Sequence, residues 1–184
     1  MNHVLIVTDM QNDYITGVLG TKEARDIADR VAAAIEEWDG PVYATRDTHA
    51  ERCPESPDGK KPSVPCCIRG TEGWEIEGRV AEALRKKGAE VLDKPTFGSM
   101  ELARVLLGDN AGFHDGSGPI AEVMLIGLHT GTSIISNALL IRTAMPNVPI
   151  RVDASCCACF TPESHRTALE AMKLCRVDIR DTMI

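Results

Sequence analysis

The sequence predicts a three-layer α/β/α fold built on a six-stranded, mainly parallel sheet. Two observations carry this prediction. Short runs rich in Val and Ile alternate with longer segments that repeat apolar residues at helical intervals, and Gly or Pro marks several of the boundaries between them. Strands that alternate with helices are joined by right-handed crossovers, which make the sheet parallel and cover both of its faces. We therefore expect a Rossmann-like sheet between two helical layers.

Six runs of about six residues each predict the strands. They are HVLIVTD, PVYATRD, AEVLDK, EVMLIGL, VPIRVDA and CRVDIRD, at residues 3–9, 41–47, 89–94, 122–128, 148–154 and 175–181. Helical spacing of apolar residues predicts helices at residues 22–38, 74–87, 99–107, 132–143 and 162–174. Gly88 is expected to end one helix, and Thr161 followed by Pro162 is a typical helix start. The irregular stretches 50–73 and 108–118 are long enough to suggest functional loops.

Length and composition predict one domain, residues 1–184. The chain is 43% hydrophobic and 26% charged, as in a globular protein with a sizeable core. A net charge of -7 without a dense Lys/Arg run argues against a nucleic-acid surface. No apolar run reaches the roughly 20 residues of a membrane helix, and the first residues lack a secretion signal. We expect a cytoplasmic protein that binds a small molecule, with no nucleic acid and no membrane as partner.

The chain has 7 cysteines, an odd number, in a sequence long enough to build a core without disulfides. We expect reduced thiols, most of them small buried hydrophobes. The adjacent pairs at 66–67 and 156–157 do not match the spacing of a zinc ribbon. Cys66 alone is considered further, because of its place in a candidate metal site.

Polar residues at the carboxyl ends of strands are the candidates for chemistry, because ligands of open parallel sheets bind beyond those ends. The first strand ends at Asp9 and the third at Lys94. The fourth runs into a turn and helix at GLHTGTS, residues 127–133. A carboxylate, an ammonium group and a helix N-terminus are therefore expected to converge on one crevice, as at a nucleophilic site.

Three motifs resemble those of a known family. DMQNDY at residues 9–14, DKPTFGSM at 93–100 and TRDTH at 45–49 are similar to motifs of the nicotinamidase and isochorismatase-like cysteine hydrolases, and the resemblance covers residues 3–179. It implies an amidohydrolase acting on a small carboxamide such as nicotinamide. It also implies a homo-oligomer, a dimer or tetramer.

The resemblance assigns a catalytic triad to Asp9, Lys94 and position 133, which is serine here instead of the family's cysteine. The family pattern Cys-Thr-Asp-x-Cys aligns with His129 to Ser133, and three of its five positions differ. Serine is either a substitution for a parent cysteine or a natural divergence, which His129 and Gly131 favour. We keep both explanations.

The triad suits a thiol better than a hydroxyl. A cysteine pKa of about 8.5 can be lowered by a lysine and a helix N-terminus, whereas a serine hydroxyl is much harder to ionise. The family's aspartate takes the proton of the nucleophile, and backbone N–H groups hold the oxyanion. These donors would be the amides of Ser133 and His129. Substrate binding is thus expected to survive even where turnover is lost.

The resemblance also implies a site for one divalent metal, zinc or iron. Asp47 and His49 lie two residues apart, so their side chains share one side of an extended segment. Glu55 and Cys66 match the two remaining ligand positions, with cysteine in place of the family's histidine. All four residue types are acceptable zinc ligands. In the alternative, Asp47 and His49 only form hydrogen bonds and no metal binds.

Tyr14 and Phe97 are the candidate walls of the substrate pocket, since each lies within five residues of a triad member in a chain with only 4% aromatic residues. Either could instead be a core residue. His129 is a candidate base or a misplaced neighbour of the nucleophile. His165 is expected at the surface or partly buried.

Three hypotheses for function follow. The first is a nicotinamidase-like amidohydrolase whose cycle is arrested or slowed by Ser133. The second is a metal-independent isochorismatase-like hydrolase of vinyl ethers. The third is a catalytically silent binding protein on the same scaffold.

Overall fold

A single parallel sheet of six strands organises the molecule. The computed structural model describes residues 2–50, 64–112 and 120–180, without the side chains of 109–112. The strand order is β3-β2-β1-β4-β5-β6, and every neighbouring pair is parallel. The strands are β1 (Asn2–Thr8), β2 (Val42–Asp47), β3 (Glu90–Lys94), β4 (Ile120–Leu128), β5 (Ile150–Ala158) and β6 (Asp178–Arg180). The predicted α/β fold is confirmed.

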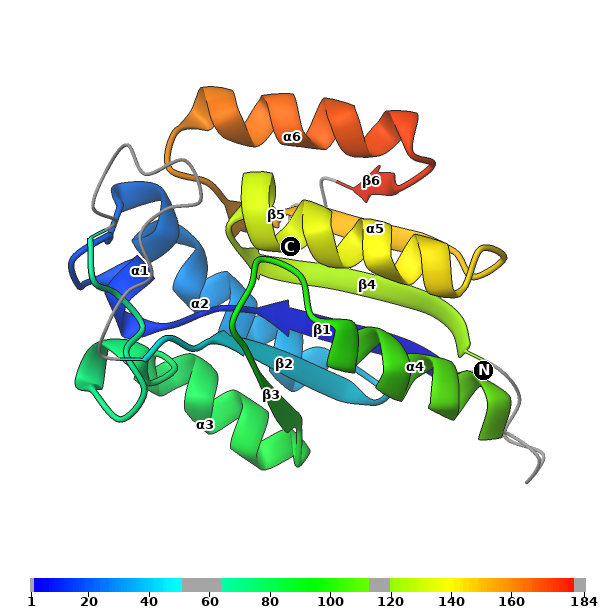
Figure 1. Cartoon of the computed structure of the whole chain (residues 1–184), viewed down its shortest axis with the longest axis horizontal. Coiled ribbons are helices and arrows are strands. Elements are labelled where there is room, and N and C mark those ends of the chain that lie inside the picture. The colour runs from blue at the N-terminus through cyan, green and yellow to red at the C-terminus, as the bar shows by residue number, and fades with distance from the viewer. Residues whose placement is uncertain (1, 51–63, 113–119, 181–184) are drawn as a thin grey trace.

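Helices cover both faces of the sheet (Figure 1). They are α1 (Asn12–Ile15), α2 (Lys22–Glu37), α3 (Gly78–Lys87), α4 (Met100–Gly112), α5 (Ile135–Ala144) and α6 (Pro162–Leu174), with a 3₁₀ turn η1 (Glu72–Trp74) and a π-helical turn η2 (Thr130–Ile134). One core packs α2 and α3 against Leu5 and Val7 of β1. The other packs α4, α5 and α6 against Val4 and Ile6. Alternate residues of one strand therefore enter opposite layers, as the pleat requires.

Local sequence signals set the helix ends. Thr161 caps α6 through the amide of Ser164, with Pro162 as the first helical residue. Gly88 ends α3 in the left-handed conformation, with φ of 63°. These two predicted boundaries are confirmed. The helix expected at 132–143 instead begins with the π-helical turn η2, so it starts two residues earlier and is wound more widely at the start.

The order of the strands defines where a ligand can bind. From β1 the chain continues to β2 and β3 on one side, whereas β4, β5 and β6 lie on the other side. The strand order thus reverses between β1 and β4, and a crevice forms at such a reversal beyond the carboxyl ends of the strands. Asp9 follows β1 and η2 follows β4, so both lie at this edge of the sheet, where the strand order reverses.

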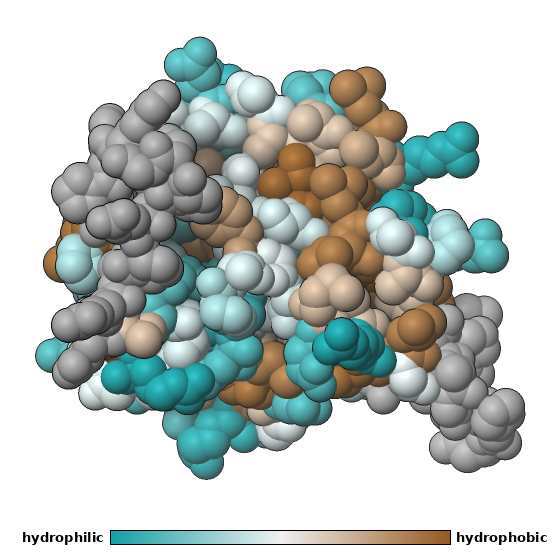
Figure 2. Space-filling model, in the orientation of Figure 1, coloured by the Kyte–Doolittle hydropathy of each residue, from teal (hydrophilic) through white to brown (hydrophobic). Residues whose placement is uncertain are grey.

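The surface over α4 and α5 carries apolar side chains among polar ones (Figure 2). Met100, Leu107 and Leu139 are exposed there. In the part of the chain that the structure describes, no helix is both long enough and apolar enough to cross a membrane.

Gly127 provides a test of the packing between β1 and β4. It has φ of 111°, and a Cβ atom at this position would lie 2.3 Å from the carbonyl oxygen of Thr8. We expect Gly127→Ala to lower the free energy of unfolding by about 2 kcal/mol or more, because it adds both backbone strain and a clash with main chain. Urea denaturation measures this change.

The control is Gly78→Ala, at the start of α3, where an added Cβ meets nothing within 4 Å. Its effect should stay within about 1 kcal/mol. Equal effects of the two substitutions would contradict this account of Gly127.

Candidate active site

Asp9 lies directly after β1 and turns the chain away from the sheet. Its φ of 51° is left-handed, a conformation that aspartate tolerates better than most residues. The Asp9 amide donates to the carbonyl of Thr45 at 3.0 Å, and the Thr45 hydroxyl donates to Asp9 Oδ1 at 2.7 Å. Asp9 is thus completely buried, and Thr45 of β2 holds both its backbone and its carboxylate.

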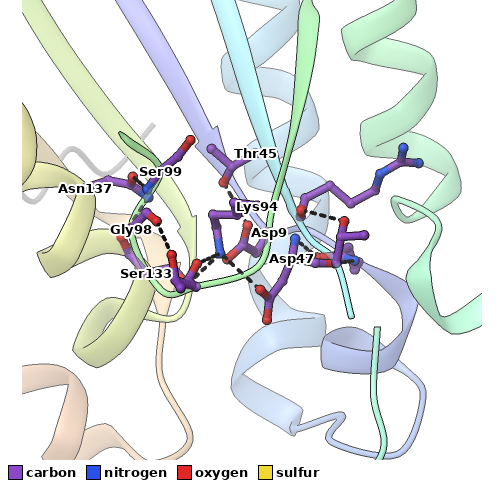
Figure 3. Close-up of polar contacts among 12 residues, drawn as sticks. Asp9, Thr45, Asp47, Lys94, Gly98, Ser99, Ser133 and Asn137 are labelled. Carbon is purple, nitrogen blue, oxygen red and sulfur yellow. Dashed lines mark hydrogen bonds and ion pairs between the residues drawn. The ribbon is translucent and has the colours of Figure 1, made fainter. Parts of the chain in front are cut away.

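Lys94 is the last residue of β3, and its side chain is 1% exposed. Nζ lies 2.7 Å from Asp9 Oδ2 and donates to the Thr96 carbonyl at 3.0 Å. It also lies 3.5 Å from both Ser133 Oγ and Asp47 Oδ1 (Figure 3). A buried ammonium group is tolerated only with such partners. Lys94 therefore connects the carboxylate after β1 with the hydroxyl on η2.

Ser133 lies in η2, with its side chain facing Lys94, and is 4% exposed. Asn137 fixes this turn, because its Nδ2 donates to the Ser133 carbonyl at 2.9 Å while its Oδ1 accepts from the Ser99 amide at 2.8 Å (Figure 3). The clamp ties η2 to the start of α4. The structure thus brings Asp9, Lys94 and Ser133 together, as the sequence predicted.

Asp9 has the electrostatics of a proton acceptor. Burial raises the pKa of its carboxyl group, and the charge of Lys94 opposes this rise. A carboxyl group with a raised pKa holds a proton more readily than an ordinary aspartate, which suits general acid–base catalysis. The Ser133 hydroxyl is among the groups that interact with it.

His129 lies between the end of β4 and η2, and the peptide bond that precedes it is cis. Its carbonyl accepts hydrogen bonds from the amides of Thr132 and Ile134, both at 3.1 Å. The backbone of His129 is thereby attached to the turn that carries Ser133. Its assignment, with Ser133, as an oxyanion donor stays a prediction.

The imidazole of His129 is enclosed by aromatic rings. It stacks on Phe160 at a centroid distance of 4.1 Å and meets Tyr14 edge-on at 4.7 Å. Burial lowers the pKa of His129 to about 4, so the ring is neutral at pH 7. Among the described residues, Nε2 has no hydrogen-bond partner.

Asp47 links the candidate metal site to Lys94. Its Oδ2 accepts from the Tyr14 hydroxyl at 2.6 Å and lies 3.1 Å from His49 Nε2, while Oδ1 faces Lys94. Burial and the charge of Asp47 raise the pKa of Tyr14, so its hydroxyl remains a donor. The side chain of Gln11 holds the backbone of Asp47: its Oε1 accepts from the Asp47 amide at 2.7 Å, and its Nε2 donates to the Asp47 carbonyl at 2.8 Å.

The described residues do not form a complete metal site. Asp47 and His49 are adjacent, but no group of three or more His, Cys, Asp or Glu in the described ranges is arranged to hold an ion. Cys66 is half-buried, and a hydrogen bond with Cys67 lowers its pKa. Glu55 lies outside the described residues. Both oxygens of Asp47 have protein partners, and the described residues supply no third ligand beside Asp47 and His49.

The two predicted pocket aromatics differ in position. Tyr14 is buried beside His129 and Asp47, whereas Phe97 is 62% exposed.

Phe160 was not predicted, although it follows β5 at the same edge of the sheet and the strand-end rule would have indicated it. The hydroxyl of Thr45 was missed because nothing in the sequence of β2 separates it from a core residue. His165 is half-buried and its Nδ1 lies 2.7 Å from the Thr130 hydroxyl.

His129 predicts a pH dependence of stability. Its folded-state pKa of about 4 lies below the ordinary 6.5, so its contribution is fully present above pH 6.5 and is lost as the pH falls towards 4. Between pH 6.5 and 4.5 the native protein should lose about 2 kcal/mol more than His129→Phe, which has no group to protonate. Urea denaturation at both pH values measures the difference, and shifts at other groups, such as Asp9, cancel in the comparison. Equal losses would mean that the imidazole is charged without penalty.

Comparison with known proteins places this arrangement in a family. Residues 3–183 match the Isochorismatase domain family. The nicotinamidase/pyrazinamidase of Bacillus subtilis is 26% identical, with a TM-score of 0.78 over 98% of this chain and 100% of that one. The pyrazinamidase of Pyrococcus horikoshii, solved in complex with zinc, shares the fold at 24% identity, with a TM-score of 0.80 over 99% and 100% of the two chains.

A third solved structure has the same fold. The N-carbamoylsarcosine amidase of Thermoplasma acidophilum shares the fold at 22% identity, with a TM-score of 0.70 over 100% of this chain and 99% of that one. No curated protein sequence matches the chain. The match over residues 3–183 decides the question of family. This chain belongs to the Isochorismatase domain family, that of the isochorismatase-like cysteine hydrolases.

Proposed function

We propose that this protein hydrolyses the amide bond of a small planar carboxamide such as nicotinamide, with Ser133 as the nucleophile. The observation that carries the proposal is the buried contact of Lys94 with Asp9 Oδ2 at 2.7 Å and Ser133 Oγ at 3.5 Å. A nucleophile, a proton acceptor and a cation are thereby held in one place. The family consists of hydrolases, and solved relatives include amidases.

In the proposed reaction, Asp9 accepts the proton of the Ser133 hydroxyl as Oγ attacks the carbonyl carbon. The N–H groups of His129 and Ser133 donate to the oxyanion of the tetrahedral intermediate. Asp9 then passes its proton to the amide nitrogen, the C–N bond breaks and ammonia leaves. Water then loses a proton to Asp9 and attacks the acyl ester, the bond from the carbonyl carbon to Oγ breaks, and Asp9 returns the proton to Oγ, which releases the carboxylic acid and the Ser133 hydroxyl. Lys94 stabilises the negative charge on Asp9 and on the attacking oxygen.

The serine sets the expected rate. A hydroxyl ionises far less readily than a thiol, whose ordinary pKa is about 8.5. The groups that would bind the amide are backbone N–H groups and do not depend on the side chain at 133. Slow turnover with retained binding is therefore the behaviour we propose, and a catalytically silent binding protein is its limiting case.

The nucleophile can be tested by exchange at position 133. Ser133→Cys should raise kcat/KM for nicotinamide about tenfold or more, which corresponds to at least ~1.4 kcal/mol of transition-state stabilisation, and Ser133→Ala should abolish turnover. Ammonia release measures both. The matched control is Ser136→Cys, one helical turn along and half-buried, which should change little. A cysteine variant inactive on nicotinamide, pyrazinamide and related amides would refute the amidase proposal.

The buried ion pair of Lys94 and Asp9 leads to a second prediction, in which a double variant regains stability without regaining activity. Lys94→Met leaves the Asp9 carboxylate without its cation and should cost about 3–5 kcal/mol of stability. Adding Asp9→Asn removes the uncompensated charge, so the double variant should regain most of that stability while amide hydrolysis stays lost. Urea denaturation and ammonia release measure the two properties. Recovery of activity in the double variant would contradict the assigned roles.

A divalent metal, zinc or iron, at Asp47, His49, Glu55 and Cys66 stays a prediction. The 3.1 Å approach of His49 to Asp47 and the zinc complex of the Pyrococcus horikoshii relative support it. The present partners of Asp47 oppose it, so no step above depends on a metal.

The remaining expectations also stay predictions. They are a single domain over residues 1–184, a cytoplasmic location and a homo-oligomer, a dimer or tetramer. The exposed apolar side chains of Met100, Leu107 and Leu139 are consistent with a subunit interface on α4 and α5.

A further inference from the structure

His129 carries a hydrogen-bonding group that the proposed reaction does not use. The reaction requires only its backbone N–H. The side chain is 2% exposed, and Nε2 has no partner among the described residues. A buried polar atom without a partner is rare in folded proteins and indicates a missing ligand or water. A hydrogen-bond partner for Nε2 must therefore come from outside the described residues.

The imidazole is held in a fixed place beside the reacting groups. The stacked ring of Phe160 and the edge of Tyr14 enclose it, and its backbone is anchored to η2. Tyr14, which meets the imidazole edge-on, donates to Asp47, and Asp47 faces Lys94, so the ring lies close to the triad. Rigid aromatic walls with one placed polar atom are typical of a small-molecule site.

The chemistry of a neutral imidazole defines what it can bind. One ring nitrogen donates a hydrogen bond and the other accepts one. A matching partner is an uncharged acceptor or donor on a planar molecule that lies against the aromatic rings. A ring nitrogen or hydroxyl close to a carboxamide meets this description, whereas an unsubstituted phenyl ring does not.

We propose that His129 determines substrate specificity, by pairing its Nε2 with a second polar atom of a small aromatic amide whose carboxamide lies at Ser133. This inference rests on the proposed function and names the substrate class more narrowly. Discrimination follows because an amide without that atom leaves Nε2 buried and unpaired, and sites built to hydrogen-bond a substrate reject analogues that lack the bonding atom. His129 is one of the positions at which this chain departs from the family pattern, so the preference would be its own.

Binding measurements test the proposal without turnover. In Ser133→Ala, calorimetry gives Kd for benzamide and for its three pyridine analogues, nicotinamide, picolinamide and isonicotinamide. We expect at least one analogue to bind about tenfold more tightly than benzamide, a difference of ~1.4 kcal/mol. Adding His129→Phe, which keeps an aromatic ring against Phe160, should reduce this ratio to within about threefold.

Two further variants separate recognition from structure. His129→Gln retains a donor and an acceptor and should restore part of the ratio. His3→Phe, an exposed histidine at the opposite end of β1, should leave the ratio unchanged. Thermal unfolding of each variant checks the fold. If His129→Phe does not fold, His129→Gln is compared with the Ser133→Ala parent, and a smaller but measurable loss of the Kd ratio is expected.

The outcomes distinguish this inference from the proposed function. Three outcomes overturn the role of His129. The Kd ratio is unchanged in His129→Phe, no analogue binds more tightly than benzamide, or none of the four amides binds. If Ser133→Cys hydrolyses amides while the ratio is independent of His129, only the inference fails. If no variant hydrolyses amides while the ratio depends on His129, the hydrolase proposal fails and His129 remains a binding residue.

Discussion

The burial of the Lys94 ammonium group is the constraint on which the rest of the site depends. A charge that is 1% exposed costs several kcal/mol to desolvate unless opposite charges and hydrogen-bond acceptors surround it. Asp9 supplies the close contact, and Asp47 supplies a second carboxylate at longer range. These three residues come from the ends of β1, β2 and β3. The parallel order of the strands is therefore what makes the charge tolerable.

The register of the strands explains how these ends meet. Asp47 pairs with Lys94 across β2 and β3, and Thr8 pairs with Thr45 across β1 and β2. Asp9 comes one residue after its strand, and its left-handed backbone directs the carboxylate to Lys94 instead of along the strand. A shift of one residue in any pairing would turn a charged side chain to the opposite face of the sheet. Register and charge burial thus support each other.

Position 133 and position 129 affect different properties of the site. Replacing a thiol with a hydroxyl changes how readily the nucleophile ionises, while the clamp formed by Asn137 holds the turn in place regardless of that atom. An imidazole at 129 adds a neutral polar group and an aromatic face at the start of the turn that carries Ser133. In the proposed reaction, the first difference affects the rate and the second affects substrate recognition. The chain thus keeps Asp9 and Lys94 of the family pattern and differs from it at positions 129 and 133.

The sequence by itself determined the layered α/β fold and the ends of β2, β3 and β4, because the alternation of β and helical patterns and the Gly and Pro boundaries are local properties. It also indicated Asp9, Lys94 and the turn at residues 127–133, since carboxyl ends of parallel strands lie at one edge, and the resemblance to the family then selected Ser133 within that turn. Only the tertiary structure decided which side chains touch. It buried His129 between Tyr14 and Phe160 and left Phe97 exposed, because packing between distant segments has no local sequence signal. It also gave Asp47 protein partners, which depend on the register of neighbouring strands.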